Sequence, residues 1–295
     1  MPNLTDQYIR FDWAIKRLLR QKANFSVLEG FLTVFLGERI SILEILESEG
    51  NQESAEDKFN RVDIKARDSK GEIVIIEVQN TREIHYLERI LYGVAKAITE
   101  HINLGEDYYK VAKVYSISIL YFDIGKGEDY VYHGQNRFIG VHTHDELQVN
   151  VRERGAIITK LPAEIFPEYI LIRVNEFDKV AVTPMEEWMR YLKEGIISED
   201  TQAPGLREAR ERLRYHAMSK AEQRAYDEHN TARMIQNDVI DTAKLEGRKE
   251  GLAEGRLEGR TEREIEIAKN LKRAGISAEV IAQTTGLTIE RINEI

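Results

Sequence analysis

The chain has 295 residues, of which 42% are hydrophobic, enough for one large domain with an appendage or for two domains of ordinary size. It contains no cysteine, which excludes disulfides, thiolate zinc sites and cysteine nucleophiles, so any metal must be bound through oxygen or imidazole. The formal net charge of −9 arises in residues 1–200, with 25 Lys and Arg against 34 Asp and Glu, because residues 201–295 carry 17 of each.

This charge distribution argues against tight nonspecific binding of nucleic acid through a global basic field. The densest basic cluster of the first part is KRLLRQK, residues 16–22; we interpret it as a solvated helix face, with a local nucleic-acid patch as the alternative. No window reaches about 18 uninterrupted apolar residues, and the charged N-terminus lacks a signal-peptide core. We therefore expect a cytoplasmic protein with no part in a membrane.

The chain is expected to begin with two helices. Residues 11–19 carry apolar side chains at the spacing of an amphipathic helix, which Asp12 could cap. A second helix, apolar on most sides, follows in FSVLEGFLTVFLGERI and stops near Gly37. ISILEILESE then predicts a strand or a short helix that leads to a polar loop at residues 48–59.

Residues 60–80, NRVDIKARDSKGEIVIIEVQN, predict a β-hairpin. The first strand alternates apolar and polar residues, and this period of two places Asp63 on a polar face. Residues 68–71 have the composition of a hairpin turn, since Gly supplies a positive φ and Asp bonds the backbone two residues on. The second strand is mostly Ile and Val until Glu77 and Gln79, which lie on one face.

Asp63 and Glu77 on neighbouring strands could bring two carboxylates within a few ångströms, where like charges are tolerated only with a cation between them. Magnesium is the natural guest, because it prefers oxygen ligands and commonly uses one or two carboxylates with a substrate phosphate. It would then activate a water and offset charge on the phosphate. Gln79 could orient that water but cannot act as a general base at neutral pH.

Alternating strands and helices continue after the hairpin. TREIHYLERILYGVAKAITEHI predicts a helix that carries Arg89 and Tyr92, either of which could face the carboxylates; the default interpretation of Tyr92 is a core position. Its expected buried stripe is Ile84, Leu87, Leu91, Val94, Ala95 and Ile98.

KVYSISILYFDIG is a strong strand signal, and further short strands are expected in DYVYHG, RFIGVHTH and EYILIRVNEF. MEEWMRYLKEGI then predicts a helix with Trp188 and Leu192 on one stripe. The order of these elements indicates a mixed sheet covered by helices, an α/β or α+β core.

The C-terminal third is helical and charged beyond Pro204-Gly205, where we place a domain boundary. Glu-Gly recurs with a period of four over residues 246–259, so the glycines fall on one ridge of a marginal helix; a stalk, an oligomerisation helix and a flexible linker all fit. The last thirty residues resemble a helix-turn-helix unit with caps at Ser277 and Thr288. Its expected core is Ala268, Leu271, Ile276, Val280, Ile281, Leu287 and Ile292. Since its second helix offers only Arg291 as a basic side chain, contact with protein is as good an interpretation as contact with DNA.

Asp63, thirteen intervening residues and then Glu77-Val78-Gln79 resemble the PD-(D/E)XK nuclease core, in the variant where Gln replaces the motif lysine. More narrowly, six segments in order resemble the Rpn-type group of recombination-promoting nucleases and PD-(D/E)XK family transposases over roughly residues 8–200. These segments are FDWAIKRLL, NFSVLEGFL, DKFNRVDI, GEIVIIEVQN, RILYGVAKAI and KVYSISILYFDIG.

The resemblance implies a restriction-endonuclease-like α/β fold, a mixed sheet flanked by helices, and magnesium-dependent cleavage of DNA, with Mn²⁺ or Ca²⁺ as other candidate ions. Asp63 and Glu77 would be metal ligands, Val78 would lend its carbonyl, and Gln79 would stand at the lysine position, where an amide predicts slower hydrolysis. Glu29 matches the place where some members add an acidic residue, although its default interpretation is a surface position.

The expected organisation is a nuclease-like domain at residues 1–204, a charged helical linker or stalk with Glu-Gly repeats at 205–264, and a small helix-turn-helix-like unit at 265–295, with possible homo-oligomerisation through these C-terminal helices. One alternative is a DNA-associated binding protein that keeps the fold but has feeble chemistry. Another is an assembly protein, whose carboxylates form salt bridges only. Their partners would then be Arg61, Lys65 or Arg67.

Overall fold

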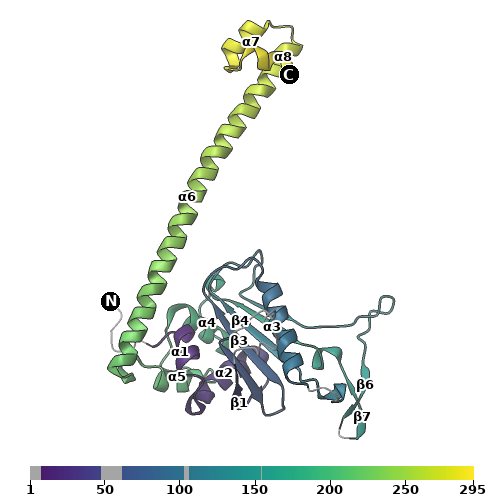
Figure 1. Cartoon of the computed structure of the whole chain (residues 1–295), viewed down its shortest axis with the longest axis vertical. Coiled ribbons are helices and arrows are strands. Elements are labelled where there is room, and N and C mark those ends of the chain that lie inside the picture. The colour runs from purple at the N-terminus through teal and green to yellow at the C-terminus, as the bar shows by residue number, and fades with distance from the viewer. Residues whose placement is uncertain (1–7, 48–61, 103–105, 154) are drawn as a thin grey trace, which may run out of the picture. The chain divides into compact units, whose positions relative to one another are not determined.

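The computed structural model describes residues 8–47, 62–102, 106–153 and 155–295, so the polar loop expected at 48–59 lies outside the described residues. The chain divides into two compact units, Met1–Gln223 and Arg224–Ile295 (Figure 1). The division falls after residue 223 and not after residue 204, because the helix that follows Gly205 packs against the N-terminal helices of the first unit.

A mixed six-stranded sheet forms the centre of the first unit, in the order β1-β2-β3-β4-β8-β5. β3, β4 and β8 run parallel to one another, and the other neighbours are antiparallel. The strands are β1 (Ile42–Leu46), β2 (Ile64–Asp68), β3 (Ile73–Gln79), β4 (Val114–Leu120), β5 (Val131–Gly134) and β8 (Glu168–Arg173). This mixed α/β sheet confirms the expected fold class, and the hairpin of β2 and β3 lies where its residues predict it.

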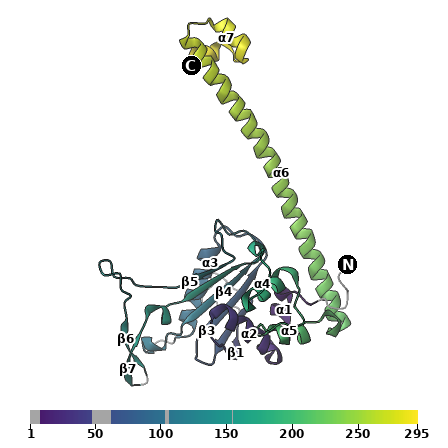
Figure 2. The ribbon, with the colours of Figure 1, turned by 180° about the vertical axis from the view of Figure 1, so that it is seen from behind.

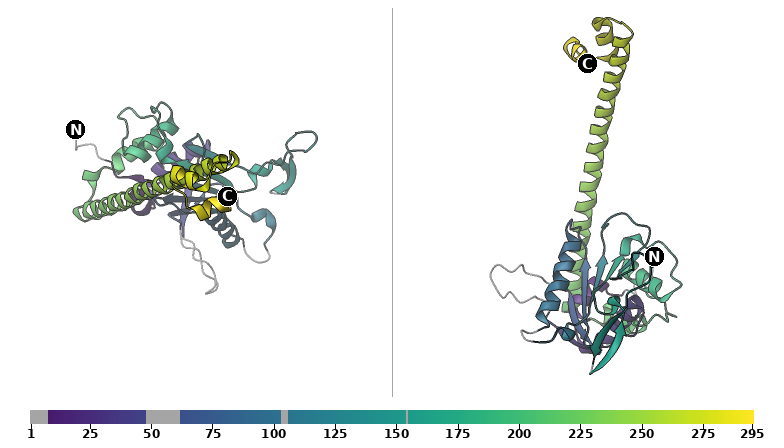
Figure 3. Two further views of the ribbon diagram at one scale, coloured as in Figure 1. Left: turned by 90° about the horizontal axis from the view of Figure 1, so that it is seen from above. Right: turned by 90° about the vertical axis from the view of Figure 1, so that its right-hand side faces the viewer.

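Helices cover both faces of the sheet. Figure 3 shows α3 on one face, with the other helices of the first unit on the opposite side. Their bounds are α1 (Phe11–Arg17), α2 (Phe25–Leu36), α3 (Tyr86–Glu100), α4 (Pro184–Glu194) and α5 (Leu206–Arg212). α2 ends where predicted, because Gly37 adopts φ 73° and caps its C-terminus.

An aromatic cluster joins α1, α2 and α4. Phe11, Phe31 and Trp188 contact one another with ring centroids 5.1–5.8 Å apart, and such tilted and edge-to-face pairs add to the burial energy. Beside this cluster, a Cβ on Gly30 would fall on the backbone of Pro204 and Gly205. Only glycine at position 30 therefore lets α2 and the start of α5 come this close.

The expected cap at Asp12 was wrong. α1 begins at Phe11 with Arg10 as its N-cap, which makes no side-chain cap bond. Asp12 is 0% exposed and lies 3.3 Å from Arg10 Nε, while its Oδ1 accepts a hydrogen bond from Trp13 N. A buried carboxylate needs a cationic partner, and Arg10 provides it.

The buried stripe of α3 also differs from the prediction. Ile84, Leu87 and Leu91 are 86%, 53% and 60% exposed, and of the expected stripe only Val94 is fully buried. The residues that pack are Tyr86, Ile90, Gly93, Val94 and Ala97. Two apolar stripes run along this helix, and packing against Ile73, Ile75 and Val114 of the sheet selects one of them.

The polar face of β2 is partly covered by α3. Lys65 is 7% exposed because Glu100 of α3 receives its ammonium at 2.8 Å. Cross-strand partners share a face, so Lys65 and Ile75 of β3 both face α3. The alternation of β2 is real, but on its polar side Lys65 is buried in a salt bridge, while Arg67 stays partly exposed beside Glu44.

The segment between β5 and β8 holds one strand pair that the sequence did not predict. RFIGVHTH is not a strand and contributes only an isolated bridge between Ile139 and Glu146. Instead β6 (Val149–Glu153) and β7 (Ala156–Lys160) form a separate two-stranded sheet, visible to the left of the central sheet in Figure 2. Ile157 is 78% exposed there, so no buried face marks the hairpin in the sequence.

The second unit is helical. It contains most of α6 (Lys220–Arg273), then α7 (Ala278–Thr285) and α8 (Ile289–Glu294). The Glu-Gly repeats lie inside α6. The small core consists of Ala268, Ile281 and Ile292 with Leu271 and Leu287 packed around it, whereas Ile276 and Val280 are 40% and 49% exposed and are not the core residues we expected. No helix among the described residues has the length and apolar character needed to span a membrane.

Candidate active site

A polar pocket of about 490 Å³ opens where the carboxyl end of β3 meets the start of β2. Its lining combines acidic, basic and amide side chains from both strands and from two helical segments of the first unit. The residues are Lys16, Arg20, Val62, Asp63, Glu77, Val78, Gln79 and Arg89. The structure therefore brings Asp63, Glu77, Val78 and Gln79, the candidate site residues of the sequence, to one pocket.

Asp63 is positioned by the antiparallel register. Asp63 directly precedes β2, whose first residue, Ile64, pairs with Ile76, so Asp63 lies beside the last residues of β3. One oxygen, Oδ2, accepts a hydrogen bond from the backbone N–H of Val78 at 2.7 Å, and Oδ1 lies 3.5 Å from Nζ of Lys16. The bond to β3 fixes the carboxylate at the edge of the sheet.

Glu77 is 7% exposed, and burial raises its pKa to about 7. Arg89 opposes this effect through its ion pair with Glu77 Oε1, and the negative charge of Asp63 adds to it. The contribution of Asp63 means that the two carboxylates interact across the strands. Glu77 thus titrates close to neutral pH, a perturbation that clusters at functional sites.

Gln79 belongs to a hydrogen-bonded chain that the sequence did not predict. Its amide nitrogen donates to Glu83 Oε1 at 2.7 Å and to the carbonyl of Thr81 at 3.2 Å. Arg89 NH1 lies 2.6 Å from the same oxygen of Glu83. Gln79, Glu83, Arg89 and Glu77 are therefore linked in series, and the amide of Gln79 is held with its nitrogen turned to the loop before α3.

The carbonyl of Val78 faces the same side as Asp63. In a strand both backbone groups of one residue point to the same neighbour, and the N–H of Val78 points to Asp63. The next residue turns to β4, since the carbonyl of Gln79 accepts from Tyr121 N at 2.9 Å. Asp63 and the Val78 carbonyl thus present oxygen to one edge of the pocket.

These residues fit a divalent cation in their chemistry. Within the described residues no group of three or more His, Asp or Glu side chains is placed to hold a metal ion. Two carboxylates and a carbonyl form an all-oxygen donor set of the kind that Mg²⁺ completes with water and phosphate. The pocket has room for a hydrated ion, and an ion would have to displace the ion pairs with Lys16 and Arg89 from the carboxylates.

Two basic residues of the cluster at 16–22, Lys16 and Arg20, line the pocket. Lys16 is exposed, as expected of a solvated helix face, and Arg20 is partly buried; both also line the pocket that holds the carboxylates. The alternative, a local nucleic-acid patch, stays a prediction. Nothing in the sequence connects a helix at residue 16 with strands beyond residue 60. Their spacing of four, which puts them on one helical face, is the only local signal.

Other sequence candidates lie elsewhere. Glu29 accepts a hydrogen bond from Ile42 N at 2.7 Å and so holds the start of β1. Tyr92 is 37% exposed and is not a core residue. Lys65 pairs with Glu100 and Arg67 pairs with Glu44, whereas the ion-pair partners of Asp63 and Glu77 are Lys16 and Arg89.

Arg61, the third basic partner proposed for the carboxylates, lies outside the described residues.

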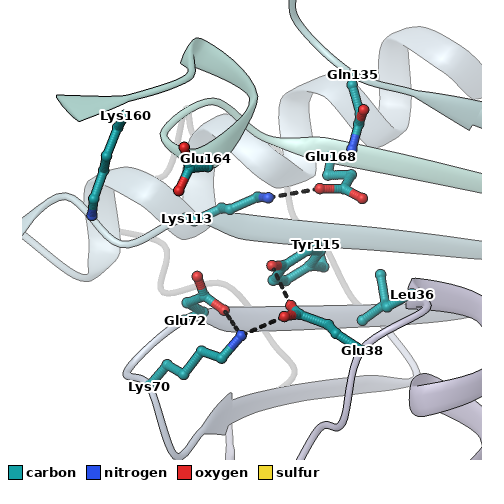
Figure 4. A pocket seen from close by; sticks show the side chains of 10 residues that line it. All are labelled: Leu36, Glu38, Lys70, Glu72, Lys113, Tyr115, Gln135, Lys160, Glu164 and Glu168. Carbon is teal, nitrogen blue, oxygen red and sulfur yellow. Dashed lines mark hydrogen bonds and ion pairs between the residues drawn. The ribbon is translucent and has the colours of Figure 1, made fainter. Parts of the chain in front are cut away.

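A second polar pocket of about 460 Å³ lies at the other end of the parallel strands (Figure 4). Lys113 reaches Glu168 at 2.6 Å, and Lys70 reaches Glu38 at 2.6 Å. Burial works against the charged form of Glu168, but the hydrogen bond from Lys113 holds its pKa below the usual value. Tyr115 donates to Glu38 at 3.0 Å. These pairs join strand ends and loops, which favours a structural role.

Comparison with known proteins gives one family match. A family model described as PD-(D/E)XK nuclease family transposase matches residues 9–243, a range that contains every residue of the first pocket. Neither the curated proteins nor the solved structures include a match.

Proposed function

We propose, from the premise that this chain belongs to the PD-(D/E)XK nuclease family of transposases, that it is a magnesium-dependent DNA endonuclease. The observation that carries the proposal is the convergence of Asp63 and Glu77 from facing strands on one pocket edged by Lys16, Arg20 and Arg89. Paired carboxylates suit a divalent cation, and the basic edge suits a phosphodiester.

Asp63, Glu77 and the carbonyl of Val78 would hold the ion. When bound, Mg²⁺ supplies a Lewis acid that activates water and offsets negative charge on the phosphate oxygens. The raised pKa of Glu77 means that metal and proton compete for this carboxylate near neutral pH. Arg89 is bonded to both Glu77 and Glu83, so it would keep Glu83 as a partner if Glu77 held the ion.

Gln79 contributes orientation rather than charge. Because its amide nitrogen is held by Glu83, the amide has a fixed orientation beside the carboxylates, and its oxygen can accept a hydrogen bond from the attacking water. An amide cannot take the proton at neutral pH. We therefore assign proton removal to solvent or to a substrate phosphate oxygen.

The biological setting we propose is DNA recombination, transposition or defence against foreign DNA, in the cytoplasm. DNA is the proposed partner of the first unit. For the second unit we propose self-association through α6, whose Met234, Val239 and Leu245 are 63–69% exposed. Exposed apolar residues along a long helix are typical of a helix that associates with a second helix.

A second candidate is a DNA-associated protein with this fold and little chemistry. It is favoured by the ion pairs, since Arg89 and Lys16 already compensate Glu77 and Asp63. It is favoured also by Gln79, which brings no positive charge to the position where the family motif has lysine. This candidate predicts DNA binding without metal-stimulated cleavage.

Plasmid nicking by the full chain distinguishes the two. Wild type, Asp63→Asn and Glu77→Gln are compared in Mg²⁺ and in EDTA, with Glu72→Gln as the matched control. Glu72 is a partly buried carboxylate of the second pocket whose pKa burial also raises. The nuclease proposal requires nicking in Mg²⁺ by wild type and Glu72→Gln only. Equal nicking by wild type and Asp63→Asn would refute it.

A further inference from the structure

We propose that Lys16 of α1 supplies, beside the scissile phosphate, the positive charge that Gln79 cannot supply from β3. This inference rests on the proposed nuclease function and names a catalytic residue for it. Lys16 lines the same pocket as Glu77 and Gln79, and its Nζ lies 3.5 Å from Asp63 Oδ1. The ammonium thus stands at the carboxylates, although it comes from a helix 47 positions earlier in the chain.

The reach of Lys16 is set by its helix. Phe11, Trp13 and Ile15 of α1 are 0%, 4% and 0% exposed, so the helix backbone is fixed in the core. Lys16 follows Ile15 directly and its side chain is 45% exposed. A rigid backbone with a half-exposed ammonium at its edge can contact a ligand in the pocket while the stem stays in place.

The pairing of Lys16 leaves capacity for a phosphate. An ammonium has three donors, and the separation of 3.5 Å from Asp63 is longer than that of a short charge-assisted hydrogen bond. If Asp63 held a divalent cation, its attraction for Lys16 would weaken. A phosphate oxygen in the same pocket would then be an available partner for the ammonium.

Arg89 cannot take this role without leaving its partners. Its two terminal nitrogens are bonded to Glu77 and Glu83, so its charge is compensated twice. Within the described part of the chain, Lys16 forms an ion pair with one carboxylate, that of Asp63. Of the two positions, Lys16 is therefore the one whose charge a bound metal would release.

Loss of a donor aimed at the developing negative charge lowers kcat by about 100-fold. We expect this loss for Lys16→Met in Mg²⁺, with a Kd for duplex DNA within about threefold of wild type, measured by anisotropy in Ca²⁺. Lys16→Arg, which keeps the charge, should recover most of the rate. Lys22→Met is the control, since Lys22 is exposed in the short helix that follows α1 and is not among the residues that line the pocket.

The decisive variant moves the charge to the strand. If Lys16 stands in for the missing charge at position 79, the double variant Lys16→Met/Gln79→Lys should cleave at least tenfold faster than Lys16→Met. A merely structural Lys16, needed to compensate Asp63, predicts no recovery. Calorimetry with Mn²⁺ alone gives a readout independent of cleavage: Lys16→Met should bind the ion at least as tightly as wild type, because a competing cation has gone.

Four results would overturn the proposal while leaving the nuclease function intact. They are wild-type cleavage by Lys16→Met, tenfold weaker Mn²⁺ binding by that variant, equal loss of activity in Lys16→Arg and Lys16→Met, and no recovery in the double variant when Gln79→Lys alone is active. If Gln79→Lys alone is inactive, the double variant cannot report on Lys16. The rates of Lys16→Arg and Lys16→Met then test whether the charge at position 16 is needed. If wild type does not cleave in Mg²⁺, the proposed function fails, and the assignment of Lys16 to it fails too.

Discussion

Glu77→Gln removes the buried charge of the candidate site but keeps the shape of the side chain, and we expect this variant to gain stability at pH 8 while it loses cleavage. Burial raises the pKa of Glu77 from its usual 4.5 to about 7. Each pKa unit corresponds to about 1.4 kcal/mol. Holding Glu77 ionised in the folded protein therefore costs about 3 kcal/mol. This value is the upper limit for the increase in the free energy of unfolding when Gln replaces Glu77.

The sign of the pH dependence follows from the direction of this change. The folded protein binds the proton of Glu77 more tightly than the unfolded chain, so stability from this group is fully present below pH 4.5 and is lost as the pH rises through about 7. The Gln variant has no such titration. Its stability relative to wild type should therefore increase by up to about 3 kcal/mol between pH 4.5 and pH 8.

Urea unfolding in EDTA at pH 5 and pH 8, followed by tryptophan fluorescence, measures this difference. The chain has two tryptophans, Trp13 and Trp188, which are 4% and 0% exposed in the first unit, so the signal reports the unit that holds the site. Glu83→Gln is the control, because Glu83 contacts the same Arg89 but its side chain is 36% exposed. Equal destabilisation of Glu77→Gln at both pH values would refute the reasoning.

Arg89→Gln should destabilise the first unit by about 2 kcal/mol at pH 8 and by less at pH 5, because Arg89 is the cation that opposes the raised pKa of Glu77; the same fluorescence assay checks it, and no pH dependence would contradict it. Gly30→Ala should destabilise that unit by more than about 2 kcal/mol, since the new Cβ meets the backbone of Pro204 and Gly205, whereas Gly247→Ala, in open space on α6, should raise helix stability by about 1 kcal/mol in circular dichroism melts. Ile281→Asp should unfold the core of α7 and α8, because Ile281 is 0% exposed; retention of the dispersed methyl NMR signals of Ile292 would speak against that core.

The local alternation of apolar and polar residues predicts those helices and strands whose buried face is visible in their own sequence. The hairpin follows from alternation and turn residues, and it brings Asp63 to the end of β3, where its carboxylate accepts a hydrogen bond from the N–H of Val78. α4 follows from its periodicity, which buries Trp188 and Leu192. These elements needed no long-range information.

The remainder depends on contacts between distant segments. α3 offers two apolar stripes, and only packing against the sheet decides that Ile90 is buried while Leu91 is not. Lys16 reaches the site through the packing of α1, and Glu83 reaches Gln79 through the shape of one loop. β7 is exposed along most of its length, so its residues carry no pattern of buried and exposed positions that would predict a strand.

The close approach of Gly30 to Pro204 and Gly205 sets a limit on how this chain can exchange parts in evolution or in engineering. Leu206, Ala209 and Leu213 are all 0% exposed in the first unit. The residues just after Gly205 therefore belong to the core of this unit, where α5 packs against α2. If another sequence replaced the chain after residue 204, the apolar residues that Leu206, Ala209 and Leu213 cover would be exposed to solvent. The C-terminal helices can therefore be exchanged for another sequence only after Leu213, where the core of the first unit is left intact.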